Sequence, residues 1–258
     1  YDKSTGEITQ NKDGVNLGGY DLKVQGLTIG LGNSNVTNNT AVGKSALSKN
    51  TSGTNNTAVG ISALLDNTSG RDNTAVGSFA LLDNTLGNDN TAVGDSSLSS
   101  NESGNNNTAV GSSALNSLID GFENTAIGGI ALQGIKTNSG NTAVGNSSLS
   151  NNSLSGDYNT AIGNSAGKDC SGNISNCTFI GYQANDPNNN SNTIVLGNTL
   201  INSLKCQVTT ITSLSDERDK KEIKPLSYGL NYIIEINPVQ FKWNMRDGGK
   251  IDIPEIGF

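Results

Sequence analysis

The sequence predicts an all-β fold: a parallel β-solenoid (β-roll) rod of about ten coils of 17–18 residues, followed by a small truncated α+β segment. Two columns of residues predict the rod. The phrase Asn-Thr-Ala-Val-Gly recurs, with small variations, at steps of 17 and then 18 residues, and a leucine column keeps the same 17-residue step. Such a period is too short for a helix pair and suits one turn of a solenoid.

Both columns can be followed on the printed sequence. The phrase begins at Asn39, Asn56, Asn73, Asn90, Asn107, Asn124, Asn141, Asn159 and Cys177, with a last variant at Asn192. The leucines are Leu47, Leu64, Leu81, Leu98, Leu115, Leu132 and Leu149.

The residues of one coil predict its shape. Thr40 and Val42 should share one face of a short strand, with Ala41 on the other. Gly43 permits a positive φ at the corner that follows. We expect a second short strand at Leu47 and a polar turn after it. In this interpretation the valine and leucine columns are buried.

Composition allows a second interpretation. Hydrophobic residues make up 33% of the 258 residues, a low share against the 45–50% apolar of average domains, a benchmark that also counts glycine. Low hydrophobicity with many Asn, Ser, Thr and Gly residues is also typical of disorder. A disordered tract, however, has no reason to keep its columns in register, so we favour the rod.

The chain divides into four parts in order. Residues 1–30 lack the register and are predicted to form strands, at Val15–Tyr20 and Leu22–Gly30, or a cap. Residues 31–200 form the repeat rod, and residues 201–214 are Thr-rich linker strands. Residues 215–258 open with a dense charge run and form a different domain.

Within residues 215–258, Ser215 is a candidate N-cap of a helix. A short apolar helix is expected at Tyr228–Ile236, stopped before Pro238, and a strand at Val239–Trp243.

One valine and one leucine make a small core for a coil of this length. We therefore expect identical rods to associate through their spare small-residue faces. The net charge of −7 is a poor match for nucleic acid or an anionic membrane. No stretch approaches the about 20 apolar residues of a membrane span.

The sequence lacks the residues that most catalytic sites require. The sequence has no histidine, which removes Ser-His-Asp and Cys-His arrangements and most zinc sites. It has no phosphate-binding Gly-Lys-Ser/Thr loop, so we expect no cofactor, no metal and no turnover enzyme. Cys170, Cys177 and Cys206 are interpreted as small buried residues, with a Cys170–Cys177 disulfide as the alternative.

Ser215 and Lys220 are the exception. A serine nucleophile needs a base, and a lysine can serve when burial lowers its pKa. Five residues apart in a charge run, the pair is more often a helix cap beside a solvated lysine.

A resemblance favours the catalytic interpretation. Residues Ser215–Ile223, Gly229-Leu230, Asn237-Pro238-Val239, Phe241, Trp243 and Glu255–Phe258 resemble the C-terminal intramolecular chaperone domain of the endosialidase type. That family caps phage tail spikes, tail fibres and other trimeric β-structured proteins.

The resemblance implies a homotrimer whose chaperone segment is released by self-cleavage. Ser215 would be the nucleophile, Lys220 the base and Leu214–Ser215 the cleaved bond. The family continues into further helices past Phe258, so the resemblance implies a truncated domain.

The rod is similar to the Asn-Ser-Val-Ala-Ile-Gly repeats of trimeric autotransporter adhesin heads, whose period is shorter. Two functions follow as expectations: a virion fibre or tail-spike-like attachment protein, or a bacterial cell-surface adhesin. Either would contact a host glycan or protein receptor. A third hypothesis is that the threonine column Thr40–Thr142 lies flat and exposed and binds an ordered lattice such as ice.

Overall fold

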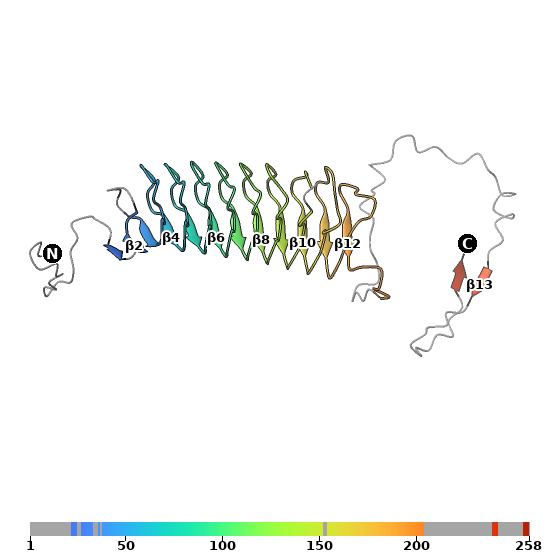
Figure 1. The fold of residues 1–258 in the computed structure, drawn as a ribbon. Coiled ribbons are helices and arrows are strands. Elements are labelled where there is room, and N and C mark those ends of the chain that lie inside the picture. Colours follow the sequence, from blue (N-terminus) through green and yellow to red (C-terminus); the bar gives the residue numbers. More distant parts are fainter. Residues whose placement is uncertain are drawn as a thin grey trace, which may run out of the picture. The chain divides into compact units, whose positions relative to one another are not determined.

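The computed structural model describes residues 22–24, 27–32, 36, 38–151, 154–203, 239–241 and 255–257. The chain divides into two compact units, Tyr1–Leu204 and Lys205–Phe258. The first unit is a stack of coils that pair through one sheet of twelve strands, β1 to β12 in chain order (Figure 1). The described part of the second unit is a two-stranded sheet.

Ten of the twelve strands, β3 to β12, are parallel neighbours, one per coil. They are β3 (Thr40–Gly43), β4 (Thr57–Val59), β5 (Thr74–Val76), β6 (Thr91–Val93), β7 (Thr108–Val110), β8 (Thr125–Ile127), β9 (Thr142–Val144), β10 (Thr160–Ile162), β11 (Thr178–Ile180) and β12 (Ile194–Leu196). The parallel β-solenoid is therefore confirmed, and its ten stacked strands are separated by about nine turns.

Strand pairing keeps equivalent residues side by side. Thr57 pairs with Thr74, Ala58 with Ala75 and Val59 with Val76, and the same register runs through the stack. The last step, from Thr178 to Ile194, takes 16 residues instead of 17 or 18. Identical side chains therefore stand in straight columns, as the repeat predicted.

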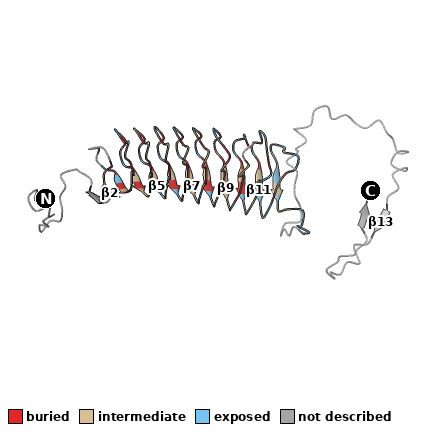
Figure 2. Ribbon diagram, viewed as in Figure 1, coloured by how far each residue is buried: buried red, intermediate tan, exposed pale blue. Residues whose placement is uncertain are grey.

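The prediction that the valine column is buried is wrong. Along the strands the alanines are buried, from Ala41 to Ala161, and Phe179 continues their column (Figure 2). Val76 and Ile162 are 37% and 45% exposed on the opposite face. The leucine column already fills the interior from the turn side, so the strand contributes only a methyl group there.

The predicted second strand is also absent from the described coils. Residues 44–49 form turns, because Ser45 and Leu47 have φ of 62° and 50°. The leucine column keeps this left-handed conformation from coil to coil, which is uncommon for a non-glycine residue. The Leu47 N–H still donates to the Ala63 carbonyl of the next coil at 3.1 Å, so coils pair outside the sheet as well.

The glycine corner is confirmed and has a steric cause. Gly77 has φ of 140°, and a Cβ there would lie 2.3 Å from the carbonyl oxygen of Gly94 in the next coil. Only glycine fits where two backbones approach so closely.

The ends of the stack differ from its middle. β1 (Leu22–Val24) and β2 (Leu27–Gly30) form an antiparallel pair, and β2 pairs antiparallel with β3. This agrees with the strands predicted for Leu22–Gly30, whereas Val15–Tyr20 lies outside the described residues.

In the second unit, β13 (Val239–Phe241) pairs antiparallel with β14 (Glu255–Gly257). β13 falls within the strand predicted for Val239–Trp243. The predicted helices lie outside the described residues.

Candidate assembly surface

The residues predicted for self-cleavage are not among those described. Leu214, Ser215 and Lys220 all fall in 204–238. Their roles remain predictions, and the structural candidates lie on the rod.

The outer face of the sheet is the most regular surface of the rod. We define it as the first and third residues of each strand from β3 to β11, which are Thr and Val or Ile, together with Ile194 and Leu196 of β12. Its valines and isoleucines are exposed or half-buried, and Ile127 and Ile180 are 42% and 43% exposed. The sequence shows this column of valines and isoleucines, but alternation alone does not say which face is outside.

The threonine hydroxyls of this face have no hydrogen-bond partner among the described residues. Threonines in the turns behave differently. Thr51, Thr68 and Thr85 each donate to a carbonyl of the next coil, at 2.7, 2.9 and 3.0 Å. The strand hydroxyls are therefore free to meet water or a partner.

Charge is absent from the outer face. No strand from β3 to β12 carries a charged residue, and the charged side chains of the coils stand at the corners and in the turns. Lys49 and Asp66, for example, form an ion pair of 2.7 Å between successive turns.

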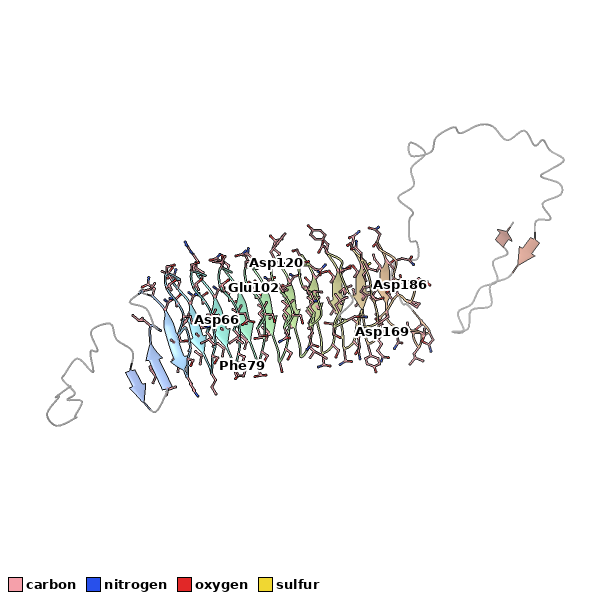
Figure 3. All side chains as sticks on the ribbon, turned by 45° about the horizontal axis from the view of Figure 1, so that its top comes forward. Asp66, Phe79, Glu102, Asp120, Asp169 and Asp186 are labelled. Carbon is pink, nitrogen blue, oxygen red and sulfur yellow. The ribbon has the colours of Figure 1, made fainter. Side chains whose placement is uncertain are left out.

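Asp66, Asp83 and Glu102 form a carboxylate cluster in these turns, and Figure 3 labels Asp66 and Glu102. Burial raises the pKa of the Asp83 carboxyl, and the negative charges of Asp66 and Glu102 raise it further, while Lys49 lowers it. The negative charges of the cluster repel one another. In the described part of the chain, no group of three or more His, Cys, Asp or Glu residues is placed to hold a metal ion.

The interior holds two further columns. The first amide column is the asparagine that opens each phrase, from Asn39 to Asn159. Each side-chain oxygen accepts the backbone N–H of the next member, as Asn56 Oδ1 does from Asn73 at 3.1 Å. Each side-chain nitrogen donates to a backbone carbonyl 14 or 15 residues further along the chain, as Asn56 does to Gly70 at 2.8 Å.

The second interior column changes character along the rod. Its members Asn50, Asn67, Asn84 and Asn101 are joined by side-chain hydrogen bonds of 2.8–2.9 Å. In the next two coils Leu118 and Ile135 take the position and are fully buried. The 17-residue spacing of these asparagines was visible in the sequence, although we did not predict the column.

Cys170 and Cys177 are free and buried, so they form no disulfide with each other. Cys177 ends the first amide column, where its N–H donates to Asn159 Oδ1 at 3.0 Å. Burial raises the pKa of the Cys170 thiol, which keeps it protonated and unreactive. Cys206 lies outside the described residues.

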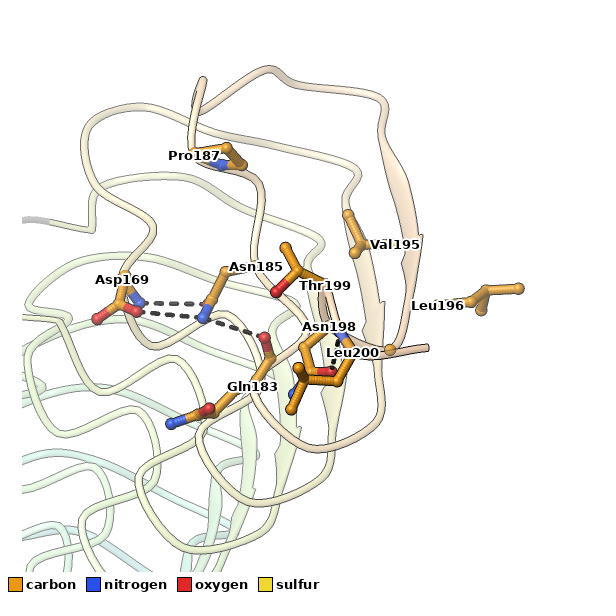
Figure 4. Close-up of a pocket in the computed structure, with 10 residues that line it drawn as sticks. Asp169, Gln183, Asn185, Pro187, Val195, Leu196, Asn198, Thr199 and Leu200 are labelled. Atoms are coloured by element: carbon orange, nitrogen blue, oxygen red, sulfur yellow. Dashed lines mark hydrogen bonds between the residues drawn. The ribbon is translucent and has the colours of Figure 1, made fainter. Parts of the chain in front are cut away.

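A cleft of about 720 Å³ opens at the β12 end of the stack (Figure 4). Asn185 donates to the Asp169 carboxylate at 3.2 Å along its wall, and the exposed Leu200 lies at its rim. Asp186, nearby in sequence, accepts the N–H groups of Asn190 and Asn188 at 2.8 and 3.0 Å, which hold its pKa below the ordinary value. The residues that line the cleft bring together no nucleophile and base.

Among the residues that the structure describes, none belongs to a helix long and apolar enough to cross a bilayer.

Comparison with known proteins finds one family. Residues 215–258 match the sequence profile of the family described as chaperone of endosialidase. No curated protein and no solved structure matches the chain. The match covers the segment whose motifs indicated this family, and the family is associated with trimerisation. Together, the stack of β-coils and the chaperone match fit a tail-fibre-like structural protein with a C-terminal chaperone domain.

Proposed function

We propose that the chain is a homotrimeric attachment fibre of the tail-fibre or tail-spike kind, exposed on a virion. The rod holds a receptor-contacting surface away from its base, and the C-terminal segment brings three chains together. The observation that carries the proposal is the order of the two parts: a parallel solenoid with an uncovered sheet face, followed by the chaperone match at residues 215–258. The receptor is a host glycan or protein.

Molar mass in solution tests assembly. We expect the full-length gene product carrying this chain to have three times the mass of one chain by light scattering at micromolar concentration. Deletion of the region from Ser215 onward should lower the yield of trimer. A folded monomer at that concentration contradicts the proposal.

Self-cleavage is the second part of the proposal. The Lys220 amine takes the proton of the Ser215 hydroxyl, and Ser215 Oγ attacks the Leu214 carbonyl carbon. The C–N bond breaks as the ester forms, and the Lys220 ammonium returns the proton to the departing nitrogen of Ser215. Water then hydrolyses the ester, which leaves a carboxylate at Leu214 and an amine at Ser215. The step needs no cofactor.

Mass spectrometry of the full-length product tests this step. We expect two fragments that meet at Leu214, and one intact chain for Ser215→Ala and for Lys220→Met. A Ser215→Ala protein still cut after Leu214 would rule out the serine as nucleophile.

A bacterial cell-surface adhesin is the second candidate. The observation that favours it is the β-roll stack itself, because its phrase is similar to the adhesin head repeat. A membrane-anchor barrel encoded downstream of this chain supports the adhesin, and a complete chaperone domain there supports the fibre.

A further inference from the structure

The outer face of the sheet, defined above, is uncovered in the single chain. Parallel sheets occur almost only with both faces covered. Here the alanine face is covered by the coil's own turns, whereas Val76, Ile127 and Ile162 on the other face remain 37–45% exposed. In nine successive strands, β3 to β11, this face repeats its valine or isoleucine and carries no charged residue.

We infer that this outer face is the surface along which copies of the chain pack against one another in the trimer. The inference rests on the proposed function and adds the contact surface to it. We expect the partner on this face to be a second copy of the chain, because the same Thr and Val or Ile residues recur on every strand at one constant spacing. A rotation axis along the rod sets equal positions of each copy at equal height. The threonine and valine columns then meet columns of the same spacing, which an unrelated partner would have to match coil by coil.

The size of the face explains why an assembly domain is needed. Strands about 4.8 Å apart make a strip about 43 Å long over nine steps, and three residues make it about 10 Å wide. Its footprint of about 430 Å² is roughly half of the 800 Å² that one partner contributes to a standard stable interface. Such a contact forms when another domain raises the effective concentration of the chains.

The free threonine hydroxyls fit the same role. Between copies they can hydrogen-bond to one another or through shared water. In an isolated rod these hydroxyls would instead contact bulk water. The hypothesis that the threonine column binds ice requires that exposed arrangement.

The test places a photo-crosslinking amino acid at Val93, in β6 of the full-length protein. The matched control carries it at Ser103, in the turn segment of the same coil. We expect cross-linked dimers and trimers from the Val93 position and almost none from Ser103. A trimer by light scattering without cross-links at Val93 overturns the inference and leaves the proposed function standing. A monomer overturns both.

A charge variant gives a second readout. Val93→Glu should bring three carboxylates together at one height and lower the temperature of trimer dissociation, whereas Ser103→Glu should leave it within a degree or two. Equal dissociation temperatures for the two variants contradict the inference. So does a trimer that binds ice crystals through an exposed outer face and loses that binding in Val93→Glu.

Discussion

Two halves of the rod fill the same interior position in different ways. In the coils from Asn39 to Asn106, the second interior column consists of asparagines bonded to one another. In the following coils, Leu118 and Ile135 occupy that position with no exposed surface. The first amide column runs unchanged through both halves. The backbone therefore requires the first column, whereas the second position accepts either an amide ladder or an apolar side chain.

The reason lies in what each asparagine bonds to. Each member of the first column accepts the backbone N–H of the next member and donates to a backbone carbonyl, as Asn56 does with Asn73 and Gly70. An apolar residue there would leave a buried N–H without an acceptor. Members of the second column bind the turn that contains them and one another. Asn50, for example, accepts from the Gly53 N–H at 3.1 Å and donates to the Gly53 carbonyl at 3.0 Å.

One hydrogen-bond acceptor is left unsatisfied at the junction between the halves. Asn101 Oδ1 is buried without a hydrogen-bond partner in the structure. The next member of the column is Leu118, which has no group to donate. An unsatisfied buried acceptor is rare in native proteins, and here the change of column chemistry accounts for it.

The largest expected effect comes from forcing an amide into the apolar half. Ile135→Asn removes a fully buried side chain and adds polar atoms beside Leu118, so we expect a loss of about 3–5 kcal/mol in the free energy of unfolding. Leu118→Asn should lose about 1 kcal/mol less, because its amide can donate to Asn101 Oδ1. Urea unfolding at one fixed protein concentration measures both.

Ile135→Ala and Leu118→Ala are the controls, since they remove apolar surface and add no amide. If the two asparagine variants differ no more than the two alanine variants do, then the vacant acceptor of Asn101 does not matter.

A smaller effect is expected inside the amide half. Asn84→Ala removes bonds to Asn67 and Gly87 and leaves Asn67 Oδ1 buried without a donor, so we expect a loss of about 2–3 kcal/mol. Asn101→Ala should cost about 1 kcal/mol less, because its own acceptor is already unsatisfied. Equal losses in urea unfolding would show that the junction is satisfied by another route, such as a buried water.

The repeat made the architecture predictable. Equal spacing of Asn, Gly and Leu requires that equivalent residues stack, and the parallel register follows from that. The alternation at Thr40, Ala41 and Val42 also placed alanine opposite the other two. It did not reveal which face is interior, and the preference of valine for buried positions led to the wrong choice.

Two features were beyond sequence reasoning for a physical reason. Leucine with φ near 50° is disfavoured in isolation, so no local rule predicts the turn at Leu47; the bond to Ala63 in the next coil and burial hold it there. The exposure of the outer face could not be predicted from the sequence, because it depends on which face of the sheet the turns cover in the folded coil. Ser215 and Lys220 remain predictions from the resemblance.

The smallest expected effects are electrostatic and have opposite signs in the two halves. The pKa of Asp83 is raised in the folded rod, so the folded state holds that proton more tightly than the unfolded chain does. Its ionisation costs stability as the pH rises through the folded pKa, and Asp83→Asn should stabilise the rod at neutral pH by a few tenths of a kcal/mol.

Asp186, near the other end, shows the reverse. Its pKa is lowered by the N–H groups of Asn190 and Asn188, so its contribution is present above the unfolded pKa and is lost as the pH falls through the folded value. Asp186→Ala should therefore destabilise the rod at neutral pH, and the difference from the natural chain should shrink in acid. Thermal unfolding of both variants at pH 7 and pH 3 measures the two signs. If both variants shift the melting temperature in the same direction at pH 7, the local hydrogen bonds and charges do not control these carboxyl groups.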